Sequence, residues 1–171
     1  MLKKVVFIIA SLLPFSMMAQ NVSELKFGHV NSQEVLMLLP EVKEAQAQLE
    51  IMSKNYEKEL EKMNGEYEAK VEDFIKNSKE MDEEIKKIRQ SEIVSLEQRV
   101  SLFKQTANES LQKKQETLFN PIIEKVQKAV TQVGEENGFI YIFDLKVPTL
   151  IYHSSKSIDV TPLLKKKLNI K

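Results

Sequence analysis

The fold of this chain is decided by residues 49–118, which read LEIMSKNYEKELEKMNGEYEAKVEDFIKNSKEMDEEIKKIRQSEIVSLEQRVSLFKQTANESLQKKQETL. The stretch is rich in Glu, Lys and Gln, and it contains one glycine, Gly65, and no proline. Its apolar residues recur in steps of three and four: Leu49, Met52, Tyr56, Leu60, Met63, Tyr67, Val71, Phe74, Met81, Ile85 and Ile88, then Ile93, Leu96, Val100, Phe103, Ala107 and Leu111. This spacing is close to that of a coiled coil and predicts long helices with an apolar stripe that needs a partner helix.

The stripe is interrupted at residues 77–79, because the apolar residue due at Ser78 is missing. One unbroken helix would satisfy the composition, but the interruption favours two antiparallel helices. Ser78 or Asp82 could cap the returning helix, whose first turn is acidic as the helix dipole prefers. We therefore expect a helical-hairpin arm over residues 41–120, with its tip near 77–82. Gly65 weakens the outgoing helix and is interpreted as a tolerated defect rather than a flexing point.

Composition excludes several functions. The 171 residues are 29% charged with a formal net charge of zero, so no basic excess indicates a nucleic-acid partner. Cysteine is absent, which removes thiol catalysis, cysteine–zinc sites, disulfides and a lipoprotein anchor. No GxxxxGK[ST] phosphate loop and no local Ser/His/Asp arrangement is present. We expect neither an enzyme nor a cofactor.

The N-terminus resembles a signal peptide over residues 1–20. Lys3 and Lys4 precede the apolar run 5–13, which is too short to span a membrane. Cleavage is expected near Ala19, so the protein is predicted to be exported. The signal holds two of the 25 basic residues and none of the acidic ones, which leaves a net charge of −2 for the mature chain. No second apolar run predicts a membrane span.

Residues 21–40 and 121–171 flank the arm and predict a small α+β body. Strands are expected at about 25–30, at 139–144 and at 149–152, the last two forming a hairpin. Asn31 or Ser32 is expected to cap a first short helix, and Thr161-Pro162 a last one. Asn120-Pro121 is expected to end the returning arm helix and start another. That helix would end at Gly138, or a turn earlier at Gly134.

A body of this size is marginal alone, and the segment 139–143 (FIYIF) is apolar on both faces, so oligomerisation is expected to cover it. The residues predicted to form the core of the body and of its oligomer are Phe27, Val30, Phe139, Tyr141, Ile142, Phe143 and Ile151.

The order of these segments resembles the Skp (OmpH-like) family of periplasmic chaperones. The resemblance covers essentially the whole mature chain, and its most specific parts are the strand and helix near Val30, the block PIIEKVQKAVTQVGEENGF at 121–139, and IDVTPLL at 158–164. It implies a homotrimer in which each chain adds strands to a central β-barrel body and extends one helical hairpin around a cavity. It further implies ATP-independent holding of unfolded outer-membrane β-barrel proteins, the clients, inside that cavity.

This chain departs from the well-known members of that family in charge, since those members are strongly basic. Residues 41–120 contain 14 Lys and Arg against 18 Asp and Glu, a net charge of −4. We therefore carry over no lipopolysaccharide-binding or anionic-lipid-binding residue.

Most positions of the stripe are interpreted as the seam between the two arm helices. Methionine and aromatic side chains also suit promiscuous contacts, because Met is flexible and aromatic rings offer a large area. The predicted client-binding residues are therefore Met52, Tyr56, Met63, Tyr67, Phe74, Met81 and Phe103.

The remaining polar residues have plain interpretations. Asp144 and Asp159 are expected in turns or caps. His29 and His153 could form a metal pair if their strands met, but isolated strand histidines are the favoured interpretation. The alternative function is a structural coiled-coil scaffold or spacer of the cell envelope. Such a scaffold would satisfy its stripe by fixed pairing, whereas a chaperone would leave apolar surface exposed.

Overall fold

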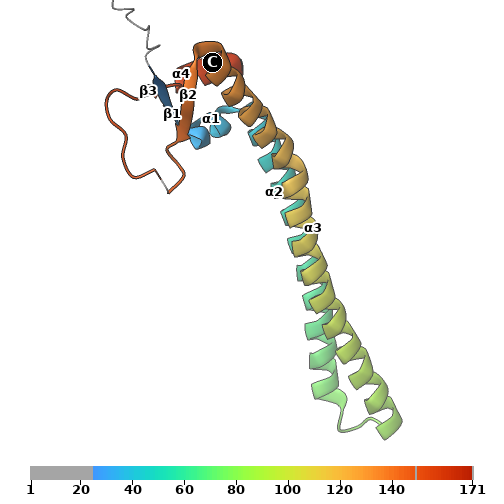
Figure 1. The fold of residues 1–171 in the computed structure, drawn as a ribbon. Helices are drawn as coiled ribbons and strands as arrows, with labels where there is room; N and C mark the ends of the chain where they lie inside the picture. Colours follow the sequence, from blue (N-terminus) through green and yellow to red (C-terminus); the bar gives the residue numbers. More distant parts are fainter. Residues whose placement is uncertain (1–24, 149, 171) are drawn as a thin grey trace, which may run out of the picture.

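The computed structural model describes residues 25–148 and 150–170. The predicted signal peptide at 1–20 lies outside this range. Figure 1 shows a small body of strands and short helices from which two long helices run side by side as an arm. The mixed α+β class and the helical hairpin predicted from the sequence are confirmed.

The arm consists of α2 (Pro40–Asn77) and α3 (Glu83–Asn137), joined by a turn at residues 78–82. Pro40 occupies the first turn of α2, where its missing N–H costs no hydrogen bond. Gly138 ends α3 in the left-handed conformation, with φ 71°, and its N–H donates to the carbonyl of Gly134. The helices therefore begin and end where the sequence supplies the backbone conformations needed.

Contrary to expectation, α3 does not end at Asn120 but continues through Pro121 to Asn137. A proline inside a helix removes one hydrogen bond and costs about 3 kcal/mol. The apolar stripe nevertheless keeps its register across Pro121, because Ile122, Val126, Ala129 and Val133 are all buried. Packing of this stripe on the body outweighs the local break, and Figure 1 shows the arm curving toward the sheet at this end.

The sheet has three parallel strands, β1 (Lys26–Val30), β2 (Phe139–Asp144) and β3 (Ile158–Asp159), in the order β2-β1-β3. Of the strand expected at 149–152, the described residues 150–152 have no regular secondary structure, and residue 149 lies outside the described ranges. β1 is the central strand, and its two edges pair with β2 and β3. Ile158–Asp159 takes the third position instead.

The core lies between one face of the sheet and the helices. It joins α1 (Ser32–Leu38) and α4 (Thr161–Lys167) to the body end of the arm. Its buried members are Val30, Val35, Leu39, Val42, Ala45, Ile122, Val126, Ala129, Val133, Val160, Leu164 and Leu168. Gly28 faces this core from β1, and a Cβ there would lie 3.0 Å from Val160 Cγ1 and 3.2 Å from Phe139. The sheet and α4 can approach this closely because position 28 has no side chain.

Polar residues after the strands tie the sheet to the short helices. Asn31 is the cap of α1, since its side chain accepts a hydrogen bond from the N–H of Glu34 at 3.2 Å. Asp144 accepts from the Ser32 hydroxyl and from the N–H of Lys146, and Asp159 accepts from the N–H of Thr161. Both aspartates therefore serve in turns and helix starts, as expected.

Candidate functional site: the apolar surfaces of the arm and the sheet

The first candidate surface is the seam between α2 and α3. Of the seven predicted client-binding residues, six lie on the two helices: Met52, Tyr56, Met63, Tyr67 and Phe74 on α2, and Phe103 on α3. Met81 lies in the turn. Met63 is buried and the other six are half-buried. Tyr56 and Phe103 pack edge to face, with ring centroids 5.8 Å apart. Of the seven residues, Tyr56 and Phe103 are thus brought into contact across the seam.

A second set of apolar side chains lies on the arm outside this seam. They are all aliphatic and between 44% and 70% exposed: Ile51, Ile75, Ile85, Ile88, Val94 and Leu102. Sequence reasoning did not select them as client contacts. Four of them stand directly beside a stripe residue, as in Ile51-Met52 and Leu102-Phe103. Adjacent helical residues point about 100° apart, so one member of each pair must leave a two-helix seam.

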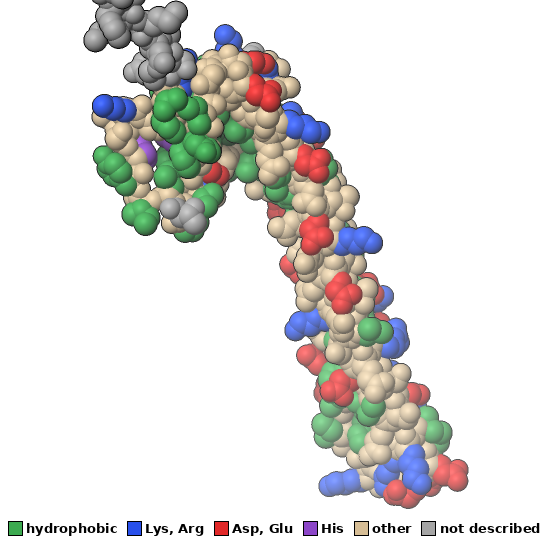
Figure 2. Space-filling view, in the orientation of Figure 1, with side chains coloured by type: hydrophobic (Ala, Val, Ile, Leu, Met, Phe, Trp, Pro, Cys, Tyr) green, Lys and Arg blue, Asp and Glu red, His purple; other side chains and the backbone are tan. Residues whose placement is uncertain are grey.

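The exposed aliphatic side chains are concentrated toward the free end of the arm. Ile75 lies close to the turn on α2, and Ile85 and Ile88 follow it on α3, with the half-buried Phe74 and Met81 beside them. Figure 2 shows hydrophobic side chains gathered on this distal part. We call Ile75, Ile85 and Ile88 the distal patch. An apolar surface at the free end of an arm is available to another molecule rather than to the core.

Shallow grooves flank the seam in the middle of the arm. One of about 490 Å³ lies beside Leu96 and Ile88, and another of about 300 Å³ lies beside Tyr67 and Val100. Half-buried Tyr67 is therefore reachable from the side of the arm.

The charges of the arm form mostly local pairs. An ion pair that crosses between the helices joins Lys70 and Glu92 at 3.0 Å, and Arg89 also contacts Glu92. Hydrogen bonds from Lys70 and Arg89 lower the pKa of Glu92 below its ordinary value. These pairs are exposed and contribute little to stability. Figure 2 shows both signs of charge scattered along the arm, so the surface remains well hydrated around its apolar residues.

The second candidate surface is the face of the sheet that points away from the core, which we call the open face. Phe27, Tyr141 and Phe143 lie there, each at least 40% exposed, and the Phe27 and Tyr141 rings stack with centroids 6.2 Å apart. Among the described residues, no strand pairs with the outer edge of β2. An apolar face beside an unpaired edge is a surface that a folded protein normally covers.

The predicted body core therefore divides into two groups. Val30 is buried, and Phe139 and Ile142 pack against the core of the same chain. Phe27, Tyr141 and Phe143 lie on the open face, and Ile151 is 95% exposed. A sequence with apolar residues on both faces of β2 could not show which face its own helices cover.

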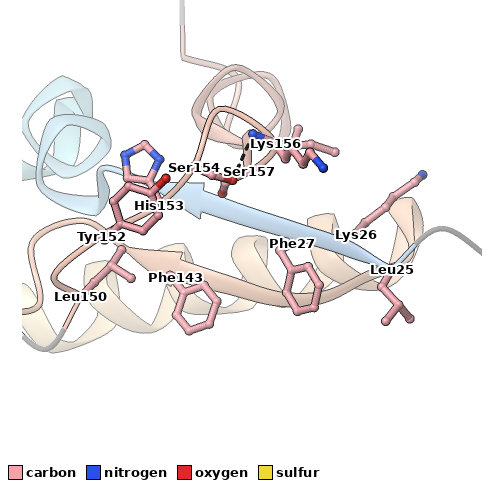
Figure 3. Close-up of a pocket in the computed structure, with 11 residues that line it drawn as sticks. Leu25, Lys26, Phe27, Phe143, Leu150, Tyr152, His153, Ser154, Lys156 and Ser157 are labelled. Carbon is pink, nitrogen blue, oxygen red and sulfur yellow. Dashed lines mark hydrogen bonds between the residues drawn. The ribbon is translucent and has the colours of Figure 1, made fainter.

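A pocket of about 620 Å³ lies between the open face and residues 150–157, which we call the strap (Figure 3). Phe27 and Phe143 line it from the sheet, and Leu150 and Tyr152 line it from the strap. Lys26, Lys156 and His153 also border it, and none of the described residues that line it is acidic.

The two histidines meet at this pocket. Their rings stack with centroids 4.4 Å apart, and Nδ1 of His29 lies 2.8 Å from the Ser157 hydroxyl. Within the described ranges, no group of three or more His, Cys, Asp or Glu side chains is arranged to hold a metal ion. The sequence left open whether the two histidines meet. They do meet, but only His29 lies in a strand, and His153 comes from the strap.

Comparisons agree with the resemblance in the sequence. Residues 26–168 match the model of the family described as outer membrane protein (OmpH-like). A comparison with curated proteins gives no match. In the part of the chain that the structure describes, none of the helices combines the length and the apolar character needed to cross a bilayer.

Proposed function

The chain belongs to the OmpH-like family, and on this premise we propose that it is an ATP-independent periplasmic chaperone that holds unfolded outer-membrane β-barrel proteins. The chaperones of this family are not enzymes. The observation that carries the proposal is the set of exposed aliphatic residues on the arm, because a scaffold would satisfy its apolar residues by fixed pairing. Six such side chains lie outside the seam, three of them in the distal patch.

We further propose that the holding unit is a homotrimer whose three arms enclose the client. The open face and the unpaired edge of β2 support assembly through the sheet, since both are surfaces that a second copy could cover. The trimeric number itself comes from the family resemblance.

Holding in such a cavity relies on many weak contacts. A single exposed isoleucine offers only part of the roughly 1.5–3 kcal/mol that full burial of such a side chain provides. Contacts of about millimolar strength dissociate quickly, but several of them enclosing one chain act at a high effective concentration. A client would therefore be retained without being bound irreversibly at any one point. The contacts predicted from the sequence remain predictions wherever their surface can be reached: Met52, Tyr56, Met63, Tyr67, Phe74, Met81 and Phe103.

Refolding suppression tests this function. An unfolded outer-membrane barrel protein is diluted from urea with and without the mature chain, with no nucleotide added, while light scattering and the mass of the complex are followed. Suppressed scattering, with one client per three copies, is the expected result. No suppression by a protein shown to be folded and trimeric would contradict the chaperone and favour the envelope scaffold.

The distal patch is tested by the triple variant Ile75→Gln, Ile85→Gln, Ile88→Gln. It removes apolar surface without adding charge, and we expect it to weaken client binding about tenfold while the trimer stays intact. The matched control is Met37→Gln with Ile123→Gln, which changes exposed apolar residues of the body. Equal client binding by both variants would show that the distal patch does not contact the client.

A further inference from the structure

We propose that His29 and His153 form a pH-sensitive latch that holds the strap against the open face at neutral pH and releases it when both rings carry a proton. The proposal concerns the chain itself and does not depend on the chaperone function.

The strap is held to the sheet at few points. Its described backbone hydrogen bonds are local, from Leu150 to Val147 and from Ser157 to Ser154. Its polar and aromatic contacts with the sheet converge on one side chain, because His29 stacks on His153 and lies within hydrogen-bond distance of Ser157. His29 projects from the central strand on the same face as Phe27, beneath the strap. The position of the strap therefore depends strongly on whether the His29 ring keeps its contacts with His153 and Ser157.

Protonation changes this contact in two steps. Two neutral imidazoles stack, and one neutral ring beside one cation is also an attractive arrangement. Two imidazolium rings with centroids 4.4 Å apart repel each other. The bond to Ser157 survives protonation, because a protonated Nδ1 donates to a hydroxyl oxygen that can accept. Release therefore follows from the second proton, through the stack.

Charged groups of both signs surround the histidine pair. Asp159, paired with His29 across β1 and β3, places a carboxylate beside this ring. Lys26, Lys156 and Tyr152 border the same pocket, and the two lysines add positive charge on its rim. Lys165 of α4 lies near Asp159 and weakens its influence on the ring. In the closed strap, two protonated rings would therefore face each other beside two lysines, with one carboxylate near His29.

The pH range of the latch lies above the one in which Asp144 and Asp159 take up a proton. Histidine ordinarily titrates between about pH 5 and 8, and the chain contains two histidines. Although burial opposes it, hydrogen bonds lower the pKa of both Asp144 and Asp159, so these anchors of the body stay ionised at about pH 5. The strap can therefore open while the sheet and helices remain folded.

The test measures the distance between two nitroxide labels on the full mature chain at about pH 8 and about pH 5. The chain has no native cysteine, so cysteines introduced at Ser155 in the strap and Gln33 in α1 are labelled selectively. Excess unlabelled protein removes distances between copies. Circular dichroism at both pH values checks that the chain stays folded.

We expect the ratio of open to closed strap to rise about tenfold on acidification of the otherwise native chain. His153→Phe keeps a stacked ring that cannot take a proton, and it should stay closed at both pH values. Tyr152→Phe, a neighbouring change that leaves both histidines in place, should respond like the native chain. An unchanged label distance in the native chain, or equal release in His153→Phe, would overturn the latch.

Discussion

Two glycines of this chain respond oppositely to an added methyl group. Gly65 lies exposed in the interior of α2, where a Cβ would have no heavy atom within 4 Å, whereas a Cβ at Gly28 would meet Val160 and Phe139 at 3.0 to 3.2 Å. Gly65→Ala is expected to raise the free energy of unfolding by about 0.5–1 kcal/mol, because alanine loses less backbone entropy in a helix. Gly28→Ala is expected to lower it. Urea unfolding at one fixed protein concentration measures both, and a stabilised Gly28→Ala would contradict the close packing of β1 on the core.

Asp144 should make the body sensitive to acid. Its carboxylate is partly desolvated, but hydrogen bonds from the Ser32 hydroxyl and from the N–H groups of Lys146 and Ser32 outweigh this and lower its pKa. A carboxyl whose pKa is lower in the folded state contributes stability above its unfolded value of about 3.9, and this contribution is lost as the pH falls through the folded pKa.

Asp144→Asn should therefore be less stable than the native chain at neutral pH, with the difference shrinking as the pH falls to about 3. Urea unfolding across this pH range gives the comparison. Asp82→Asn is the control, since Asp82 starts α3 without a side-chain cap hydrogen bond. A pH-independent difference for Asp144→Asn would mean that shape rather than charge fixes this contact.

At the scale of the elements, a substitution in the seam should lower stability, whereas a substitution of an exposed aliphatic residue should leave stability nearly unchanged. Leu96 is 5% exposed between the helices, whereas Leu102 is 63% exposed on the same helix. Leu96→Ala is expected to cost about 2–4 kcal/mol, since it leaves a cavity in the seam. Leu102→Ala should change stability by less than about 0.5 kcal/mol. Thermal unfolding of the arm, followed by circular dichroism, distinguishes them, and equal losses would place Leu102 in a contact that the single chain does not show.

The helices were predictable because their apolar period is long, regular and nearly free of breakers. Two features of the helices could not be predicted from the sequence, for physical reasons. Pro121 is a local helix-ending signal, but the stripe on both of its sides packs on one continuous surface, and tertiary packing prevailed. The apolar stripe also does not reveal how many of its neighbouring apolar residues fit between two helices. Pairs such as Leu102-Phe103 therefore hid which residue faces the partner helix and which faces solvent.

At the scale of the whole molecule, assembly is expected to depend on the open face. Tyr141→Asp places a charge on a side chain that is 59% exposed and stacked on its neighbours, so the single chain should fold while the trimer dissociates. Ile142→Asp is a poorer test, because Ile142 packs against the core of its own chain. Sedimentation of Tyr141→Asp, with circular dichroism to check its helices, gives the result. A variant that is still trimeric would show that the interface lies outside the open face.

The topology of the sheet also determines which part of the chain folds first. Ser32 and Asp144, which meet beside the ends of β1 and β2, are 112 residues apart in the chain. Contacts so distant in sequence form slowly, because closing a long loop is opposed by its entropy. The arm can form from its own turn at 78–82 through short-range contacts, and this brings Glu41 against Lys125 and shortens the remaining loop. A newly made chain would therefore complete its arm first and its sheet last, so the open face forms only after the arm is in place.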